Sequence, residues 1–216
     1  YRYEFVDQDG IDKNANASTL KTRLTYKSAS FNGLTALLEV DNVTLVGSES
    51  YRTPSNGKIG YPIVADPDGT DVNQASLTYK NDGYRAILGR QRILHSGQRF
   101  VGGVGWRQNE QTYDAFTLSS KSLGPVAIDY SYIWDVNRIF GPKDSAAQPK
   151  RWESDSHILL AAMSPAKGHS VKGYAYLLDF ADATANSSST YGIEYRGKFD
   201  GFVLDAAYAT QSDYAE

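Results

Sequence analysis

A two-residue alternation of apolar and polar side chains recurs in short segments along the whole chain. In an extended strand, successive side chains point to opposite faces of the sheet. Such strands suit a soluble sheet whose apolar face packs on a core. They equally suit a membrane barrel whose apolar face meets lipid and whose polar face lines a wet lumen. The clearest segment is 126–136, whose alternate apolar members are Val126, Ile128, Tyr130, Tyr132, Trp134 and Val136.

Composition excludes several classes of protein. The 216 residues contain no cysteine, which excludes disulfides and thiolate metal sites, and the net charge of −3 gives no basic footprint for nucleic acid. No apolar run reaches the ~20 residues that a transmembrane helix needs. The 16 tyrosines fit strands and membrane interfaces alike. We expect residues 1–216 to form one β-domain, cut at both ends because the chain starts and stops in or near strands.

The alternation predicts about eleven antiparallel strands and no long helix. The connections between them alternate in length, with tight Asn-Gly or Asp-Gly turns at one end and long polar loops at the other. This alternation of short and long connections is typical of outer-membrane barrels, which have short periplasmic turns and long external loops. The predicted strands are 1–8, 18–28, 33–46, 72–80, 84–93, 113–121, 125–137, 153–163, 169–180, 189–198 and 202–213.

Assigning faces by parity gives an outer apolar face and an inner face with many charges of both signs. A dry core does not hold unpaired ions, because each costs several kcal/mol, whereas a water-filled lumen does. Bacterial barrels have an even number of strands, and an open sheet would expose unpaired backbone groups of its two edge strands to lipid. We therefore expect the chain to be part of a larger barrel. The inner charges of the second, third and seventh segments include Lys21, Arg23, Glu39, Asp41 and Asp129.

The segment 89–115 carries the most distinctive motifs. They are Gly89-Arg90-Gln91, Arg99-Phe100-Val101-Gly102, Gly105-Trp106-Arg107-Gln108 and Thr112-Tyr113-Asp114-Ala115. With these motifs the segment resembles the alginate-export family of Gram-negative outer-membrane porins. The resemblance implies a monomeric barrel of about eighteen strands and an arginine-lined pore for an anionic polyuronate.

The same segment also makes physical sense as a loop folded into a lumen. Its glycines let the backbone turn back on itself, and its arginines carry planar forks that bind carboxylates. We therefore expect Arg90, Arg92 and Arg107 to line the pore, together with Lys21 and Arg23. The alternative is that these cations brace the wall by pairing with lumen carboxylates such as Glu39, Asp41 and Asp129. The mixed sign of the inner face also disfavours a polyanion and leaves a general porin open.

Other chemistry has little support. Segments 7–12 and 66–71 resemble fragments of calcium loops, but neither has the distal glutamate of an EF-hand. The three histidines show no metal-ligand spacing, and no Gly-x-Ser-x-Gly elbow occurs. We expect no cofactor, no metal and no catalytic residue.

The sequence thus predicts a channel in the outer membrane of a Gram-negative bacterium, contacting outer-membrane lipid. It would pass small hydrophilic solutes, anionic or sugar-like, by passive diffusion. The alternative is a non-conducting β-sheet protein acting as a surface adhesin, receptor or binding module.

Overall fold

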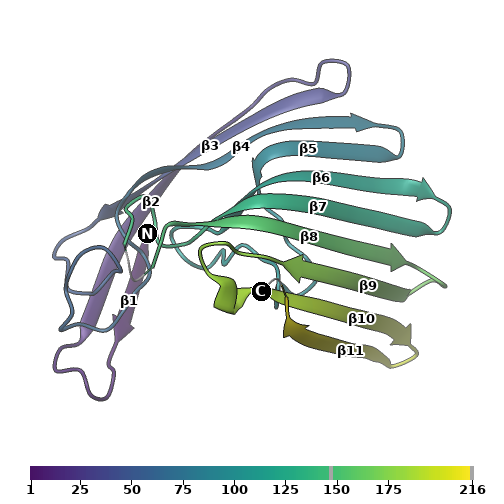
Figure 1. Ribbon diagram of the computed structural model, residues 1–216. Coiled ribbons are helices and arrows are strands. Elements are labelled where there is room, and N and C mark those ends of the chain that lie inside the picture. The colour runs from purple at the N-terminus through teal and green to yellow at the C-terminus, as the bar shows by residue number, and fades with distance from the viewer. Residues whose placement is uncertain (146–147, 215–216) are drawn as a thin grey trace.

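The computed structural model describes residues 1–145 and 148–214. They form eleven strands and one short 3-10 helix, η1 at Thr184–Asn186 (Figure 1). No helix among the described residues is long and apolar enough to span a membrane. The strands are β1 Arg2–Val6, β2 Ala15–Lys27, β3 Leu34–Leu45, β4 Gly69–Asn81, β5 Tyr84–Gln91, β6 Thr112–Leu123, β7 Val126–Asn137, β8 Arg151–Met163, β9 His169–Leu178, β10 Ser188–Phe199 and β11 Phe202–Asp213.

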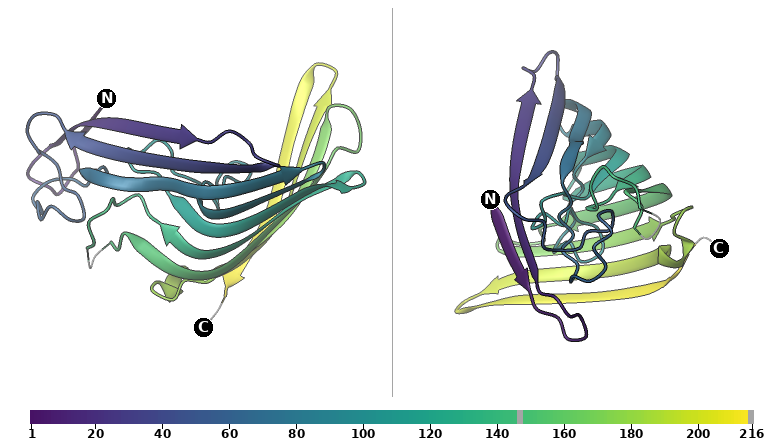
Figure 2. Two further views of the ribbon diagram at one scale, coloured as in Figure 1. Left: turned by 90° about the horizontal axis from the view of Figure 1, so that it is seen from above. Right: turned by 90° about the vertical axis from the view of Figure 1, so that its left-hand side faces the viewer.

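All eleven strands belong to one antiparallel sheet, and each pairs with its neighbours in chain order. This confirms the predicted meander. The sheet has two edges, β1 and β11, and it curls so that one face is convex and the other concave (Figure 2). The sheet is therefore an unclosed part of a barrel.

The alternation of connection lengths is also confirmed. At one end the strands join through short turns at 28–33, 82–83, 124–125, 164–168 and 200–201; at the other through the long connections 7–14, 46–68, 92–111, 138–150 and 179–187. In the first short turn, 28–33, the backbone conformation explains why Asn and Gly occupy positions 32 and 33. Asn32 and Gly33 have φ of 48° and 83°, and a Cβ on Gly33 would lie 2.4 Å from the carbonyl oxygen of Lys80.

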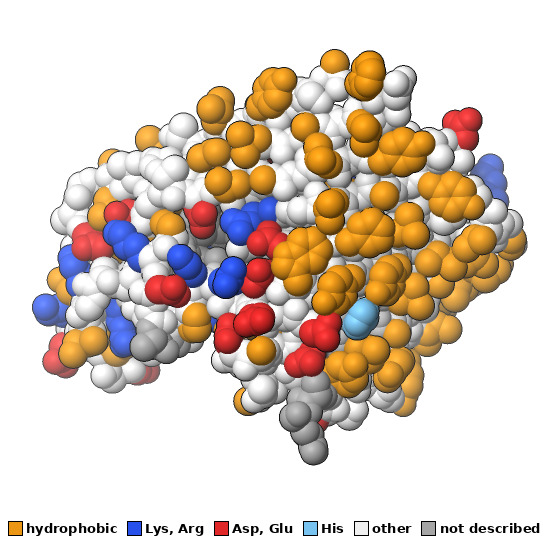
Figure 3. All heavy atoms as spheres, turned by 45° about the horizontal axis from the view of Figure 1, so that its top comes forward, with side chains coloured by type: hydrophobic (Ala, Val, Ile, Leu, Met, Phe, Trp, Pro, Cys, Tyr) orange, Lys and Arg blue, Asp and Glu red, His pale blue; other side chains and the backbone are white. Residues whose placement is uncertain are grey.

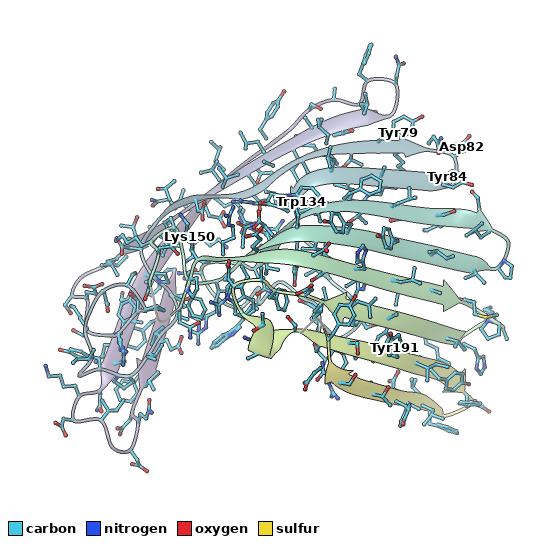
Figure 4. All side chains as sticks on the ribbon, in the orientation of Figure 1. Tyr79, Asp82, Tyr84, Trp134, Lys150 and Tyr191 are labelled. Carbon is cyan, nitrogen blue, oxygen red and sulfur yellow. The ribbon has the colours of Figure 1, made fainter. Side chains whose placement is uncertain are left out.

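The convex face is apolar and exposed, as the parity of the strands predicts. Leu24 and Leu77 are 74% and 55% exposed, and orange side chains cover this face beside a charged margin (Figure 3). Aromatic side chains gather near both ends of the strands. Tyr79 and Tyr84 flank the tight turn at Asp82 (Figure 4).

One expectation about the faces is wrong. The alternation of 126–136 breaks at Trp134, an extra residue of β7 between Ile133 and Asp135, which pair with the adjacent residues Ala115 and Asp114 of β6. As a result Val136 is 3% exposed and packs with Ile133 on the concave side, not with the convex aromatic row. A β-bulge adds one residue to a strand, which reverses the faces of all residues beyond it.

The concave face carries an apolar part beside the expected charges of both signs. Over β6–β9 it has a buried apolar cluster that packs against the connection 92–111, because small and apolar residues point inward from these strands. A second cluster joins β2 to the connection 46–68 through Ala15, Ala17, Tyr51 and Val64. Buried members of the first cluster are Ile93, Val101, Tyr113, Ala115, Ile133, Val136, Ile158, Tyr174, Tyr176 and Phe180.

Candidate functional site

The connection 92–111, called the inner loop below, folds onto the concave face. It leaves the sheet after Gln91 and returns at Thr112. At one end Arg107 Nη1 donates to Glu4 Oε2 on β1 at 2.9 Å. In the middle of the loop, the ring of Phe100 lies 6.1 Å from the ring of Tyr174 on β9. The loop therefore spans the concavity from β1 to β9, which fits the predicted loop within a lumen.

Local backbone conformation explains why this segment can turn so sharply. Ser96, Gln98 and Val104 all have positive φ, at 49°, 57° and 48°. This left-handed region is costly for residues with a Cβ, and for a β-branched valine most of all. The loop holds these conformations because Tyr113 anchors it from β6: its hydroxyl donates to the carbonyl oxygen of Gly102 at 2.8 Å.

Six charged residues tie the inner loop to β2 and β3 in one network. Arg23 donates to both oxygens of Asp41 at 2.6 Å and to Glu110 of the loop at 2.8 Å. Arg92 of the loop donates to Glu110 at 2.5 Å and to Glu39 at 2.6 Å.

Lys21 completes the network by pairing with Asp41 at 3.2 Å. The network holds three cations (Lys21, Arg23, Arg92) and three carboxylates (Glu39, Asp41, Glu110), so its formal charge is zero. We call it the strand–loop network.

Glu110 lies at the centre of the strand–loop network. Burial opposes its ionisation, but hydrogen bonds from Arg92, Arg23 and Asn73 outweigh burial and lower the pKa of Glu110 to about 2. The carboxylate is therefore charged at neutral pH. It binds two guanidinium groups that come from different segments of the chain.

A second group of charges, called the β1 cluster below, fixes the part of the inner loop around Arg107 to β1. Arg107 and Arg2 share Glu4, with the Arg2 Nη2–Glu4 Oε2 distance at 2.6 Å. Arg2 Nε also lies 3.1 Å from Asp66, and the backbone N–H of Gln108 donates to Asp66 at 2.9 Å. Burial raises the pKa of Asp66. Two cations and two carboxylates again cancel.

The structure brings most of the predicted site residues together, but two lie elsewhere. Lys21, Arg23, Glu39, Asp41 and Arg92 share the strand–loop network, and Arg107 belongs to the β1 cluster. Each of these cations has a carboxylate partner, as the bracing alternative requires.

Arg90 is one of the two residues that lie elsewhere. It shares the face of Leu88, opposite to Gln91, and makes a bidentate pair with Asp114 at 2.8 and 3.0 Å. It borders a polar cleft of about 670 Å³ that is also lined by Asp41 and Glu110 of the strand–loop network. Arg90 therefore shares this cleft with the network, although it lies on the strand face of Leu88.

Asp129 lies on the concave side near the short turns, where sequence reasoning missed a group of cations. Lys80, Arg85, Lys121 and Asp129 line a depression of about 410 Å³. Lys80 and Arg85 are paired directly across β4 and β5. Among the described residues none of the three cations makes an ion pair. Three cations and one carboxylate leave a net charge of +2; we call this set the basic depression.

The signal for the basic depression was present in the sequence. Strand parity puts Lys80 on the inner face, and the tight turn at Asn81-Asp82-Gly83 sets Arg85 opposite to it. Like charges directly opposite each other destabilise a sheet, so the Lys80–Arg85 pair does not stabilise the pairing of β4 with β5.

Within the described residues no group of three or more His, Asp or Glu side chains is arranged to hold a metal ion. In the segment 66–71, which resembles part of a calcium loop, the carboxylate of Asp66 pairs with Arg2 and Arg107.

No protein-family model and no curated protein sequence matches the chain. Solved structures do. OccAB4 of Acinetobacter baumannii superposes with a TM-score of 0.71 at 16% identity, covering 99% of this chain and 57% of that one. OpdK of Pseudomonas aeruginosa, solved with vanillate, gives 0.68 at 11% identity, covering 95% and 54%. OccK9 (OpdG) of the same species gives 0.66 at 15% identity, covering 97% and 54%.

These neighbours are outer-membrane porins, so the fold is that of a porin barrel wall. The chain spans just over half the length of the structures it matches. The likeness shows the fold; the finer resemblance to alginate exporters has no match among the comparisons.

Proposed function

We propose that the chain forms part of the wall of an outer-membrane channel that passes small hydrophilic, anionic solutes by passive diffusion. The observation that carries the proposal is the inner loop, a connection of twenty residues (92–111) folded onto the concave face and held there by ion pairs. In a closed barrel a loop in this position narrows the lumen. Passage then depends on the charges that remain unpaired, and catalysis is not needed.

The convex face supports a membrane location. Its large apolar side chains are exposed along the strands, and aromatic residues such as Tyr26 and Phe202 (64% and 60% exposed) lie at the short-turn end. Trp134 and Tyr191 lie toward the long-loop end of β7 and β10 (Figure 4). Two aromatic girdles around an apolar band are the pattern of barrels in lipid. We infer that this face contacts outer-membrane lipid.

We further propose a division of labour among the cations. The strand–loop network and the β1 cluster are neutral, so they fix the loop and contribute little net field. The basic depression, with its net charge of +2, attracts anions to the short-turn end of the pathway. Arg99 on the inner loop, which makes no ion pair among the described residues, adds a fourth cation that a carboxylate can meet.

The solute class follows from this field. OpdK, which shares the fold, was solved with vanillate, a small aromatic carboxylate. A monomeric anion of this size is therefore one candidate, and the uronate that the sequence motifs imply is the other. Both present carboxylates to the same cations.

Conductance of the full-length gene product in a planar bilayer tests the proposal. We expect stable open steps and a reversal potential that favours anions. The double variant Arg85→Gln/Lys121→Gln should lower that preference, whereas Lys143→Gln, which removes an exposed loop cation paired with Asp68, should not. Block by oligouronate would select the polyuronate class.

Equal reversal potentials in all three proteins would refute the role of the basic depression. A folded barrel, identified by its heat-dependent shift on an SDS gel, that shows no open steps would refute the channel. It would favour the adhesin, receptor or binding-module alternative.

A further inference from the structure

A cavity of about 180 Å³ lies between the inner loop and the concave face of β6–β9. It is separate from the strand–loop network and from the basic depression, neither of which shares a lining residue with it. Its apolar walls come from the inner loop (Phe100 and Val101), from the strands (Ile133, Val136 and Trp152) and from the connection 179–187 (Phe180).

The walls of this loop–wall cavity are fixed by packing. Ile133 and Val136 are 1% and 3% exposed, and the bulge in β7 is what turns Val136 inward. The rings of Trp152 and Phe180 lie 5.1 Å apart at an angle of 45°. The two rings are already in contact with each other, so a planar ligand ring packs against this pair and makes the edge-to-face contacts that aromatic groups prefer.

The polar side chains at the cavity have partners within the protein, although the contact of Asn186, from its Nδ2 to the Ala183 carbonyl oxygen, is long at 3.5 Å. Gln111 Nε2 donates to the Gly102 carbonyl at 3.1 Å and to the Tyr113 hydroxyl at 2.8 Å. The Ser156 hydroxyl donates to the Asp179 carbonyl at 3.2 Å. No charged side chain lines the cavity.

This combination of size and chemistry limits what the cavity can hold. Water needs two to four polar partners, and an apolar cavity of roughly 150 Å³ stays dry and accepts benzene or xenon. An anion would lose its hydration without gaining a cation in return. The cavity therefore excludes the charged solutes of the proposed pathway.

We infer that the loop–wall cavity is a binding site for a small, neutral, single-ring aromatic molecule. Such a ligand contacts Phe100 and Val101 of the inner loop and Ile133 and Val136 of the wall at the same time. It braces the loop against the sheet. Binding does not depend on the proposed channel; only its effect on conductance rests on that function.

Trp152 reports binding directly. In the variant Trp106→Phe/Trp134→Phe it is the sole tryptophan of the chain, which has three. The folded protein is titrated with bromobenzene, whose heavy atom quenches indole emission, and in parallel with 4-bromobenzoate, which differs by one carboxylate. We expect a saturable loss of emission with bromobenzene, reversed by toluene as a competitor, and none with 4-bromobenzoate.

A cavity-filling variant and a matched control complete the test. Val136→Phe should abolish the quenching, whereas Leu118→Phe, on the exposed convex face, should leave it unchanged. Equal quenching by 4-bromobenzoate would overturn the assignment to neutral ligands. Quenching that rises without saturation and is not reversed by toluene would mean partition into detergent and would overturn the site. The toluene competition decides this even where Val136→Phe does not fold.

Discussion

Replacing Glu110 by glutamine tests whether ion pairs hold the inner loop on the wall. Glu110 accepts hydrogen bonds from Arg92 at 2.5 Å, from Arg23 at 2.8 Å and from Asn73 at 3.2 Å. Glutamine keeps the shape but removes the charge. The strand–loop network then changes from zero to +1, and Arg23 and Arg92 retain only Asp41 and Glu39 as partners.

The magnitude follows from the pKa. Moving a carboxyl from its ordinary value of 4.5 to about 2 corresponds to about 3 kcal/mol in favour of the ionised form, at about 1.4 kcal/mol per factor of ten. The arginines are about a quarter exposed, at 28% and 27%, so solvent screening reduces the loss. We expect the loop to lose about 1–3 kcal/mol of docking stability.

Amide hydrogen exchange of the inner loop, measured by mass spectrometry, reports this loss of docking stability. A loss of about 1–3 kcal/mol speeds exchange of loop amides roughly five- to more than a hundredfold where exchange follows local opening. The amide of Gln111, which donates to the Gly103 carbonyl at 2.8 Å, is one reporter. Glu49→Gln is the matched control, because Glu49 pairs with Lys58 in another loop. Equal protection in Glu110→Gln and wild type would refute the bracing role.

The lowered pKa of Glu110 also determines how the docking stability of the inner loop changes with pH. Because the folded pKa of Glu110 is lowered, its contribution is fully present above the ordinary pKa of 4.5 and is lost as the pH falls toward 2. The wild-type loop should lose protection across this window, and Glu110→Gln should show a smaller change. Identical pH profiles would contradict the assignment.

Three further predictions follow from single positions. Arg90→Gln should leave loop exchange unchanged, because the ion pairs of Arg90 among the described residues are with Asp114 and Asp71 of the strands and not with the inner loop; faster loop exchange would show that Arg90 helps to hold the loop. Gly33→Ala should lower the temperature of the heat-dependent gel shift, because its φ is 83° and the added Cβ meets the Lys80 carbonyl at 2.4 Å; an unchanged temperature would show that the turn relaxes freely. Leu24→Arg should reduce folding into lipid vesicles by about 2–4 kcal/mol if Leu24 lies near the bilayer midplane, measured by urea titration; no loss would mean that this face does not meet lipid.

The sequence by itself determined the architecture. The period of two, the tight turns such as Asn32-Gly33 and the alternation of loop lengths are local features, and each is confirmed in the eleven-stranded meander. The composition and position of the inner loop were likewise readable, because its glycines and arginines lie together in one segment. Strand parity also put Glu39 and Asp41 on the concave face, where both are buried.

Only the tertiary structure decided which charges are paired and which face some residues take. Arg92 meets Glu39 across 53 positions of the chain, and Arg107 meets Glu4 across 103. The extra residue of β7 between Ile133 and Asp135 turned Val136 inward, and β5 extends to Gln91, so that Arg90 lies on the strand face opposite to Gln91. The physical reason is that parity and turn chemistry act between neighbours along the chain. Bulges, ion pairs and the loop–wall cavity depend on which distant strand or loop lies opposite.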